Sequence, residues 1–266
     1  MTKKIFLLQF SLILLIFVFP PIFVKNGQNA ALDLSKFNFF VLVNFCAALL
    51  LLAQKRMAKG PRSAAGAEAS PRSAAQETEA TPKRAADPKI FERPKRAASL
   101  LRAAVFASRV LVCYGSLLLL GIFFYVAQKF LEGGAAQVTL PQNFWGWLAC
   151  AFTLFAAALY EETLYRWHLP WALKKIASPK GGGEPETAAS PKTGAETWKA
   201  RAFFWGTEAA CAVLFALVHR WQGALAVLNA FFAGIALRVC TVKAKSLAPG
   251  IAAHFLYNAS ALLFSL

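Results

Sequence analysis

Residues 144–166 read FWGWLACAFTLFAAALYEETLYR, and no other stretch of the chain is as informative. From Phe144 to Tyr160 the residues are apolar or small apart from Thr153. A membrane-spanning helix needs about 20 mostly apolar residues, so this run predicts one. Glu161 and Glu162 stand at its end, where ionisable side chains are costly and usually functional. The stretch therefore predicts a transmembrane helix that carries a functional acidic pair.

The rest of the chain extends this reading to the whole fold. Hydrophobic residues make up 58% of the 266 residues, and the mean hydropathy is +0.48. These values are typical of a polytopic membrane protein and not of a soluble domain. We predict an all-α transmembrane bundle of about seven helices, with the active site between helices four to seven. The seven apolar runs span roughly residues 5–24, 37–53, 103–127, 143–165, 202–219, 223–242 and 247–265.

The formal net charge of +16 comes mostly from polar stretches between the apolar runs. Residues 54–102 hold 12 Lys and Arg, and residues 173–201 hold 6. Cytoplasmic loops carry such an excess, so we expect both stretches and the N-terminus in the cytoplasm, and no nucleic-acid partner. The five cysteines lie in or beside apolar runs without a CxxC pair, which indicates buried thiols and not disulfides or a zinc cluster.

The same composition divides the chain into three parts. Residues 1–53 predict a hairpin of two membrane helices, the first a retained signal anchor ended by Pro20-Pro21. Residues 54–102 are basic and rich in Ala and Pro, with too few large apolar residues for a core, and predict a disordered linker. Residues 103–266 then form the catalytic core, with a polar insert at 176–200. We expect a multi-pass protein of the bacterial cytoplasmic membrane.

Glu161, Glu162 and Arg166 form the first motif. On a helix Glu162 and Arg166 are i and i+4, so they share a face and can pair. Glu161 lies about 100° away around the helix. This geometry predicts that Arg166 neutralises Glu162 and leaves Glu161 unpaired and facing a polar cavity, where a partly desolvated carboxylate suits a general base.

Two further motifs supply the other polar groups, Phe215-x-x-x-His219 and His254-x-x-x-Asn258. His254 lies among apolar residues of the last helix, and Asn258 is one turn later on the same face. Two polar groups aligned inside a membrane helix need partners within the bundle. His219 alone could be an interfacial histidine and Phe215 simple packing.

Three other polar residues belong to no motif. Glu208 is expected either at the membrane interface or in the same cavity. Arg238 is expected near a helix end, where its side chain can reach the interface. His168, just before Leu169-Pro170, is also expected at the interface.

Taken together, the three motifs resemble the CPBP family, which comprises the type II CAAX prenyl endopeptidases and their bacterial relatives. The resemblance covers roughly residues 145–265 and matches the order EExxxR, FxxxH, HxxxN. Trp167 departs from it, because many relatives have glycine after the arginine, and so does the insert at 176–200. The resemblance implies a helical intramembrane endopeptidase whose substrate is a membrane-associated peptide or protein tail.

The resemblance also implies roles for the residues. Glu161 and His219 would activate the water, His254 and Asn258 would stabilise the oxyanion, and Glu162 and Arg166 would support the geometry. A metal-free, glutamate-dependent mechanism is favoured. A zinc enzyme that uses Glu161, His219 and His254 stays open, because two His and one Glu form an ordinary catalytic zinc set.

Two other functions compete with proteolysis. One is a non-proteolytic immunity or assembly factor with the same fold. The other is a small transporter in which the polar groups relay protons, although no internal repeat supports it.

Overall fold

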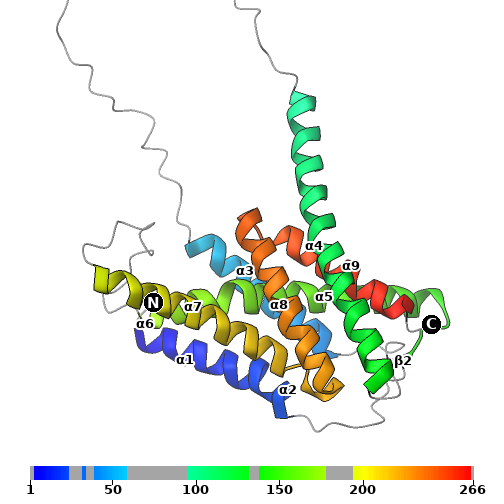
Figure 1. The fold of residues 1–266 in the computed structure, drawn as a ribbon, viewed down its shortest axis with the longest axis horizontal. Coiled ribbons are helices and arrows are strands. Elements are labelled where there is room, and N and C mark those ends of the chain that lie inside the picture. The colour runs from blue at the N-terminus through cyan, green and yellow to red at the C-terminus, as the bar shows by residue number, and fades with distance from the viewer. Residues whose placement is uncertain are drawn as a thin grey trace, which may run out of the picture.

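The computed structural model describes residues 3–23, 32–33, 39–58, 95–131, 138–177 and 194–264. Seven helical segments account for nearly all of them, which confirms the predicted all-α bundle (Figure 1). Residues 59–94 and 178–193, the larger parts of the two predicted linkers, lie outside the described residues. In order, the segments are α1–η1–α2 (Lys3–Ile13, Leu14–Val18, Phe19–Phe23), α3 (Phe39–Ala58), α4 (Lys95–Leu131), α5–η3–α6 (Phe144–Glu161, Glu162–His168, Leu169–Ala177), α7 (Gly194–Leu217), α8 (Ala224–Ala244) and α9 (Ala248–Phe264).

Two small elements complete the described chain. The turn between α7 and α8 is a short 3₁₀ helix, η4 (Arg220–Gln222). The two-residue strands β1 (Leu32–Asp33) and β2 (Val138–Thr139) pair in parallel and tie two loops together.

Five helical stretches of the described chain are long and apolar enough to cross a bilayer. They are Ile5–Phe23, Phe39–Arg56, Ser99–Leu131, Phe144–Ala177 and Ala224–Ala244. α7 and the 17-residue α9 are not among them. Many large apolar side chains on the outer faces are exposed, as lipid contact requires. The protein is a multi-pass integral membrane protein.

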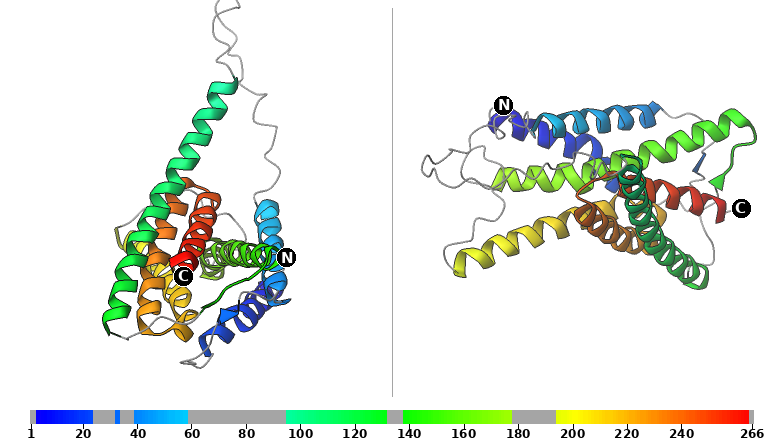
Figure 2. Two further views of the ribbon diagram at one scale, coloured as in Figure 1. Left: turned by 90° about the vertical axis from the view of Figure 1, so that its right-hand side faces the viewer. Right: turned by 90° about the horizontal axis from the view of Figure 1, so that it is seen from above.

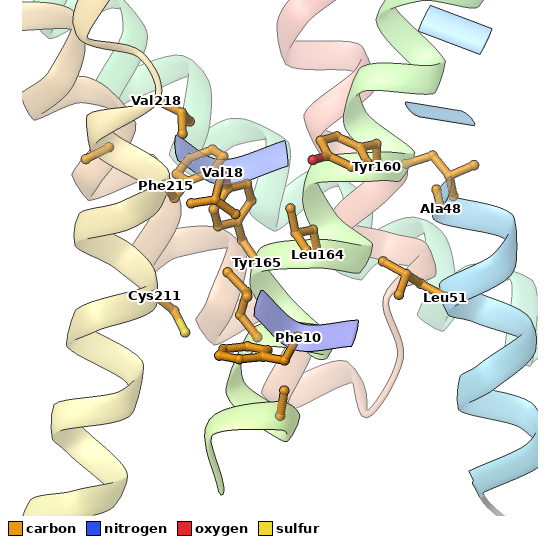
Figure 3. Close-up of a cluster of buried hydrophobic side chains, with 14 of the residues drawn as sticks. Phe10, Val18, Ala48, Leu51, Tyr160, Leu164, Tyr165, Cys211, Phe215 and Val218 are labelled. Carbon is orange, nitrogen blue, oxygen red and sulfur yellow. The ribbon is translucent and has the colours of Figure 1, made fainter. Parts of the chain in front are cut away.

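The helices pack in two groups around the long α5–η3–α6 axis. α4 lies against α8 and α9, and its N-terminal half extends beyond the bundle (Figures 1 and 2). α3 lies along α5 on another side, and α7 packs between α6 and α8. Figure 3 shows the main apolar cluster, where side chains from α1, η1, α3, η3 and α7 converge.

The α5–η3–α6 axis is continuous from Phe144 to Ala177, but residues 162–168 adopt the wider π-helical geometry. Pro170 lies just after this segment and has no backbone N–H, so it cannot donate the α-helical hydrogen bond to the carbonyl of Arg166. π-segments are rare and often lie at functional sites. This one begins at Glu162, directly after Glu161.

Candidate active site

The two adjacent glutamates face one imidazole ring from α9. His254 Nδ1 is 3.1 Å from Glu162 Oε1, and His254 Nε2 is 3.6 Å from Glu161 Oε2. The second contact is too long for a hydrogen bond, and Glu161 Oε2 has no hydrogen-bond partner within the part of the chain that the structure describes. His254 reaches both carboxylates where α5 passes into the π-segment, and the ring lies between them.

Glu162 and Arg166 pair as the i, i+4 spacing predicted. Arg166 Nη2 is 3.5 Å from Glu162 Oε1, and the two side chains are 3% and 0% exposed. The guanidinium also lies over the Phe215 ring, 4.0 Å from its centroid. Gly234 of α8 leaves room for this stack, because a Cβ there would lie 3.1 Å from Phe215 Cδ1 and 3.8 Å from Arg166 Nη2. Arg166 is thus enclosed by α7 and α8.

Phe215 contacts three residues of the candidate site. Its ring meets Arg166 on one side and also contacts His219 and His254, with centroid distances of 4.9 and 6.3 Å. Its backbone carbonyl lies 2.8 Å from His219 Nδ1. A carbonyl can only accept, so Nδ1 carries the proton and Nε2 of the neutral ring is left as an acceptor. The Phe215-x-x-x-His219 spacing therefore fixes both the tautomer and the orientation of His219.

A cavity of about 560 Å³ lies beside these groups. Glu161 and His219 both line it, together with the aromatic side chains of Tyr160 and Tyr165. Its opposite wall comes from the N-terminal helical segment and α3, including Phe17 and Phe40 among other mostly apolar residues. The cavity is thus largely apolar, where a polar one was expected, and it places a carboxylate and an imidazole against space large enough for a peptide segment.

A family model described as Type II CAAX prenyl endopeptidase Rce1-like matches residues 143–260. These residues form an Rce1-like domain of the CPBP family. The members of that family are intramembrane peptidases, so the chain contains a CPBP-family membrane protease domain. Comparisons with curated proteins and with solved structures gave no match. All six residues of the predicted catalytic set fall inside the Rce1-like domain.

Asn258 is the one predicted site residue without a contact to the others. It is half-buried one turn after His254, and its side chain makes no hydrogen bond within the described part of the chain. Its neighbour Tyr257 receives a hydrogen bond from Asn229. The Asn258 amide is therefore not engaged by another described side chain, and Asn258 is not among the residues that line the cavity.

The zinc set suggested by the residue types does not fit this arrangement. Among the described residues, no three His, Cys, Asp or Glu side chains are grouped closely enough to hold a metal ion. Both ring nitrogens of His254 already face carboxylates.

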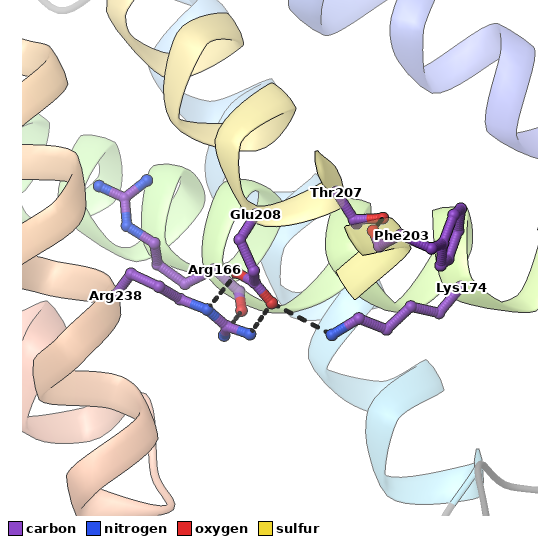
Figure 4. A network of polar contacts seen from close by, with 6 residues as sticks. All are labelled: Arg166, Lys174, Phe203, Thr207, Glu208 and Arg238. Carbon is purple, nitrogen blue, oxygen red and sulfur yellow. Dashed lines mark hydrogen bonds and ion pairs between the residues drawn. The ribbon is translucent and has the colours of Figure 1, made fainter. Parts of the chain in front are cut away.

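Three polar residues outside the motifs, His168, Glu208 and Arg238, make their contacts within the bundle. His168 is 1% exposed and packs against Trp167 and Trp171, so its expected interfacial position was wrong. Glu208 binds Arg238 and Lys174 within the bundle (Figure 4). Glu208 precedes Phe215 by seven residues, two helical turns on one face, and that spacing was the signal that could have linked it to the site.

Proposed function

We propose that this protein is an intramembrane endopeptidase that hydrolyses a peptide bond in a membrane-associated peptide or protein tail. The observation that carries the proposal is the His254 ring held between Glu161 and Glu162, beside a cavity that Glu161 shares with His219. Buried carboxylates and imidazoles in contact at the edge of a cavity are a typical constellation for acid–base catalysis.

Glu161 is the proposed general base. It is 21% exposed and lines the cavity, whereas Glu162 is fully buried and paired with Arg166. Glu161 takes a proton from a water molecule, and the hydroxide attacks the scissile carbonyl carbon. His219, with Nε2 as an acceptor, receives a hydrogen bond from the same water and orients it.

His254 transfers the proton and stabilises the developing negative charge. Its Nδ1 donates to Glu162, since a carboxylate accepts. Its Nε2 faces Glu161, so a proton taken up by Glu161 can pass to this nitrogen. The protonated ring and the free Asn258 amide then donate to the oxyanion of the tetrahedral intermediate. Breakdown of the intermediate returns the proton to the leaving amine and completes the hydrolysis.

The test compares peptide termini in membranes from cells that carry wild-type protein or Glu161→Gln. Gln keeps the size of the side chain but cannot accept the proton. We expect new termini with wild type only and at least a 10²-fold loss with the variant, the usual contribution of a general base. Glu196→Gln is the matched control, because position 196 lies in the first turn of α7, at the opposite end of that helix from Phe215.

The control should leave the termini unchanged. If wild type gives no termini beyond those of cells that lack the protein, proteolysis is contradicted and the immunity or assembly role is favoured. Cleavage retained by Glu161→Gln at the same sites would assign the base to another residue.

A further inference from the structure

A partly buried ion cluster outside the catalytic set contacts the backbone of the site. Glu208 of α7 accepts two hydrogen bonds from Arg238 of α8, Nε to Oε2 and Nη2 to Oε1, both 2.6 Å long. Lys174 of α6 donates to Glu208 Oε1 at 3.1 Å. The remaining guanidinium nitrogen, Arg238 Nη1, donates to the backbone carbonyl of Arg166 at 2.7 Å (Figure 4).

The Arg166 carbonyl lies where the π-segment gives way to the α-helix α6. Pro170 has no N–H, so position 170 gives no hydrogen bond to the carbonyl of Arg166, four residues before it, or of Tyr165, five residues before it. A backbone carbonyl left unpaired inside a membrane bundle is costly. Arg238 supplies the donor from a neighbouring helix, at the point where the chain leaves the π-segment.

The same two helices also hold the other end of Arg166. Gly234, one turn before Arg238 on α8, lies against its guanidinium, and Phe215, two turns after Glu208 on α7, stacks on it. The side chain in turn pairs with Glu162, which binds His254. Both the backbone and the side chain of Arg166 are therefore held by the α7–α8 pair.

We infer that Arg238 is a positioning residue for the proposed reaction. It replaces the hydrogen bond that Pro170 cannot make, and Glu208 holds the guanidinium in the orientation that this requires. Two guanidinium nitrogens bind the Glu208 carboxylate, and the third is left for the Arg166 carbonyl. A lysine ammonium is not planar and cannot bind both groups in this geometry. The inference rests on the proposed function for its effect on cleavage, but its structural part can be measured without a substrate.

The first measurement is amide hydrogen exchange of residues 162–171 in detergent-solubilised full-length protein. Arg238→Gln should accelerate exchange in this segment about tenfold, the effect of losing one charge-assisted hydrogen bond. Lys174→Met is the matched control, because Lys174 binds the same carboxylate but not the Arg166 carbonyl. It should change exchange there less than about twofold.

The substitution Pro170→Ala provides the decisive background. An alanine at this position has an N–H that can reach the Arg166 carbonyl, so adding Arg238→Gln to Pro170→Ala should accelerate exchange clearly less than it does in wild type. If the ion cluster only joins the helices, Arg238→Gln should accelerate amide exchange equally in wild type and in Pro170→Ala. That result would overturn the inference, as would equal effects of Arg238→Gln and Lys174→Met.

The second measurement is the rate of appearance of the wild-type-dependent peptide termini. Arg238→Gln should lower it about tenfold, Lys174→Met should leave it near wild type, and Arg238→Lys should recover it only in part. Unchanged cleavage by a folded Arg238→Gln variant would also overturn the inference. If wild type produces no new termini, the proposed function fails, and the exchange experiment alone decides on Arg238.

Discussion

Replacement of Arg166 by alanine is the sharpest test of the packing around the two glutamates. The variant leaves the Glu162 carboxylate, which is 0% exposed, without its guanidinium partner. Removing one member of a buried ion pair costs about 3–5 kcal/mol of unfolding free energy. His254 Nδ1 still contacts Glu162 at 3.1 Å and offsets part of that cost, whereas the lost stacking on Phe215 adds to it. We therefore expect a loss of about 3 kcal/mol, near the lower end of that range.

The free energy of unfolding can be measured in mixed micelles by following tryptophan fluorescence. Arg109→Ala is the matched control, because its side chain is exposed and makes one long hydrogen bond, 3.4 Å, to the Ala244 carbonyl. We expect it to cost less than about 1 kcal/mol. In the double variant Glu162→Gln/Arg166→Ala the unpaired charge is gone, so at least about 1 kcal/mol should return.

An Arg166→Ala variant whose unfolding free energy lies within about 1 kcal/mol of wild type would contradict this expectation. A double variant no more stable than Arg166→Ala would contradict it as well. Either outcome would mean that the carboxylate of Glu162 does not depend on this guanidinium.

Two further substitutions test the packing and the oxyanion site. Gly234→Ala places a Cβ 3.1 Å from Phe215 Cδ1. Overpacking of about 1–3 kcal/mol should exceed the helix-propensity gain of about 1 kcal/mol, so the same unfolding assay should show a net loss. Gly206→Ala meets nothing within 4 Å and should keep the gain, and equal effects of the two substitutions would refute the close contact. Asn258→Ala should reduce the rate of appearance of new termini at least 10²-fold with unchanged unfolding, whereas full activity would remove Asn258 from the site.

Part of the fold could be predicted because it depends on local properties. Long apolar runs become helices in a bilayer, because an α-helix pairs the backbone N–H and C=O groups within a single segment. All seven predicted runs are helical, within several residues at most ends. The Glu162–Arg166 pair was equally local, because i, i+4 spacing brings two side chains together on any helix.

Other parts needed the packed structure. Apolar runs of membrane helices show little difference between their faces, because lipid and protein neighbours are both apolar. The sequence therefore did not indicate which helix faces meet. Glu208 was expected at the membrane interface or in the cavity and Arg238 near a helix end, because their separation of 30 residues does not reveal a bidentate contact between α7 and α8.

The sequence by itself determined the helical class and the residue types of the candidate site, because runs of apolar residues and the motif spacings are local properties. Only the tertiary structure decided that His254 lies between Glu161 and Glu162, since His254 and Glu162 are 92 residues apart and belong to different helices. It also decided that α5 continues through the π-segment to Ala177, and that Arg238 supplies the donor that Pro170 lacks. These contacts depend on how the helices pack against one another, and that packing is determined by many side chains at the same time.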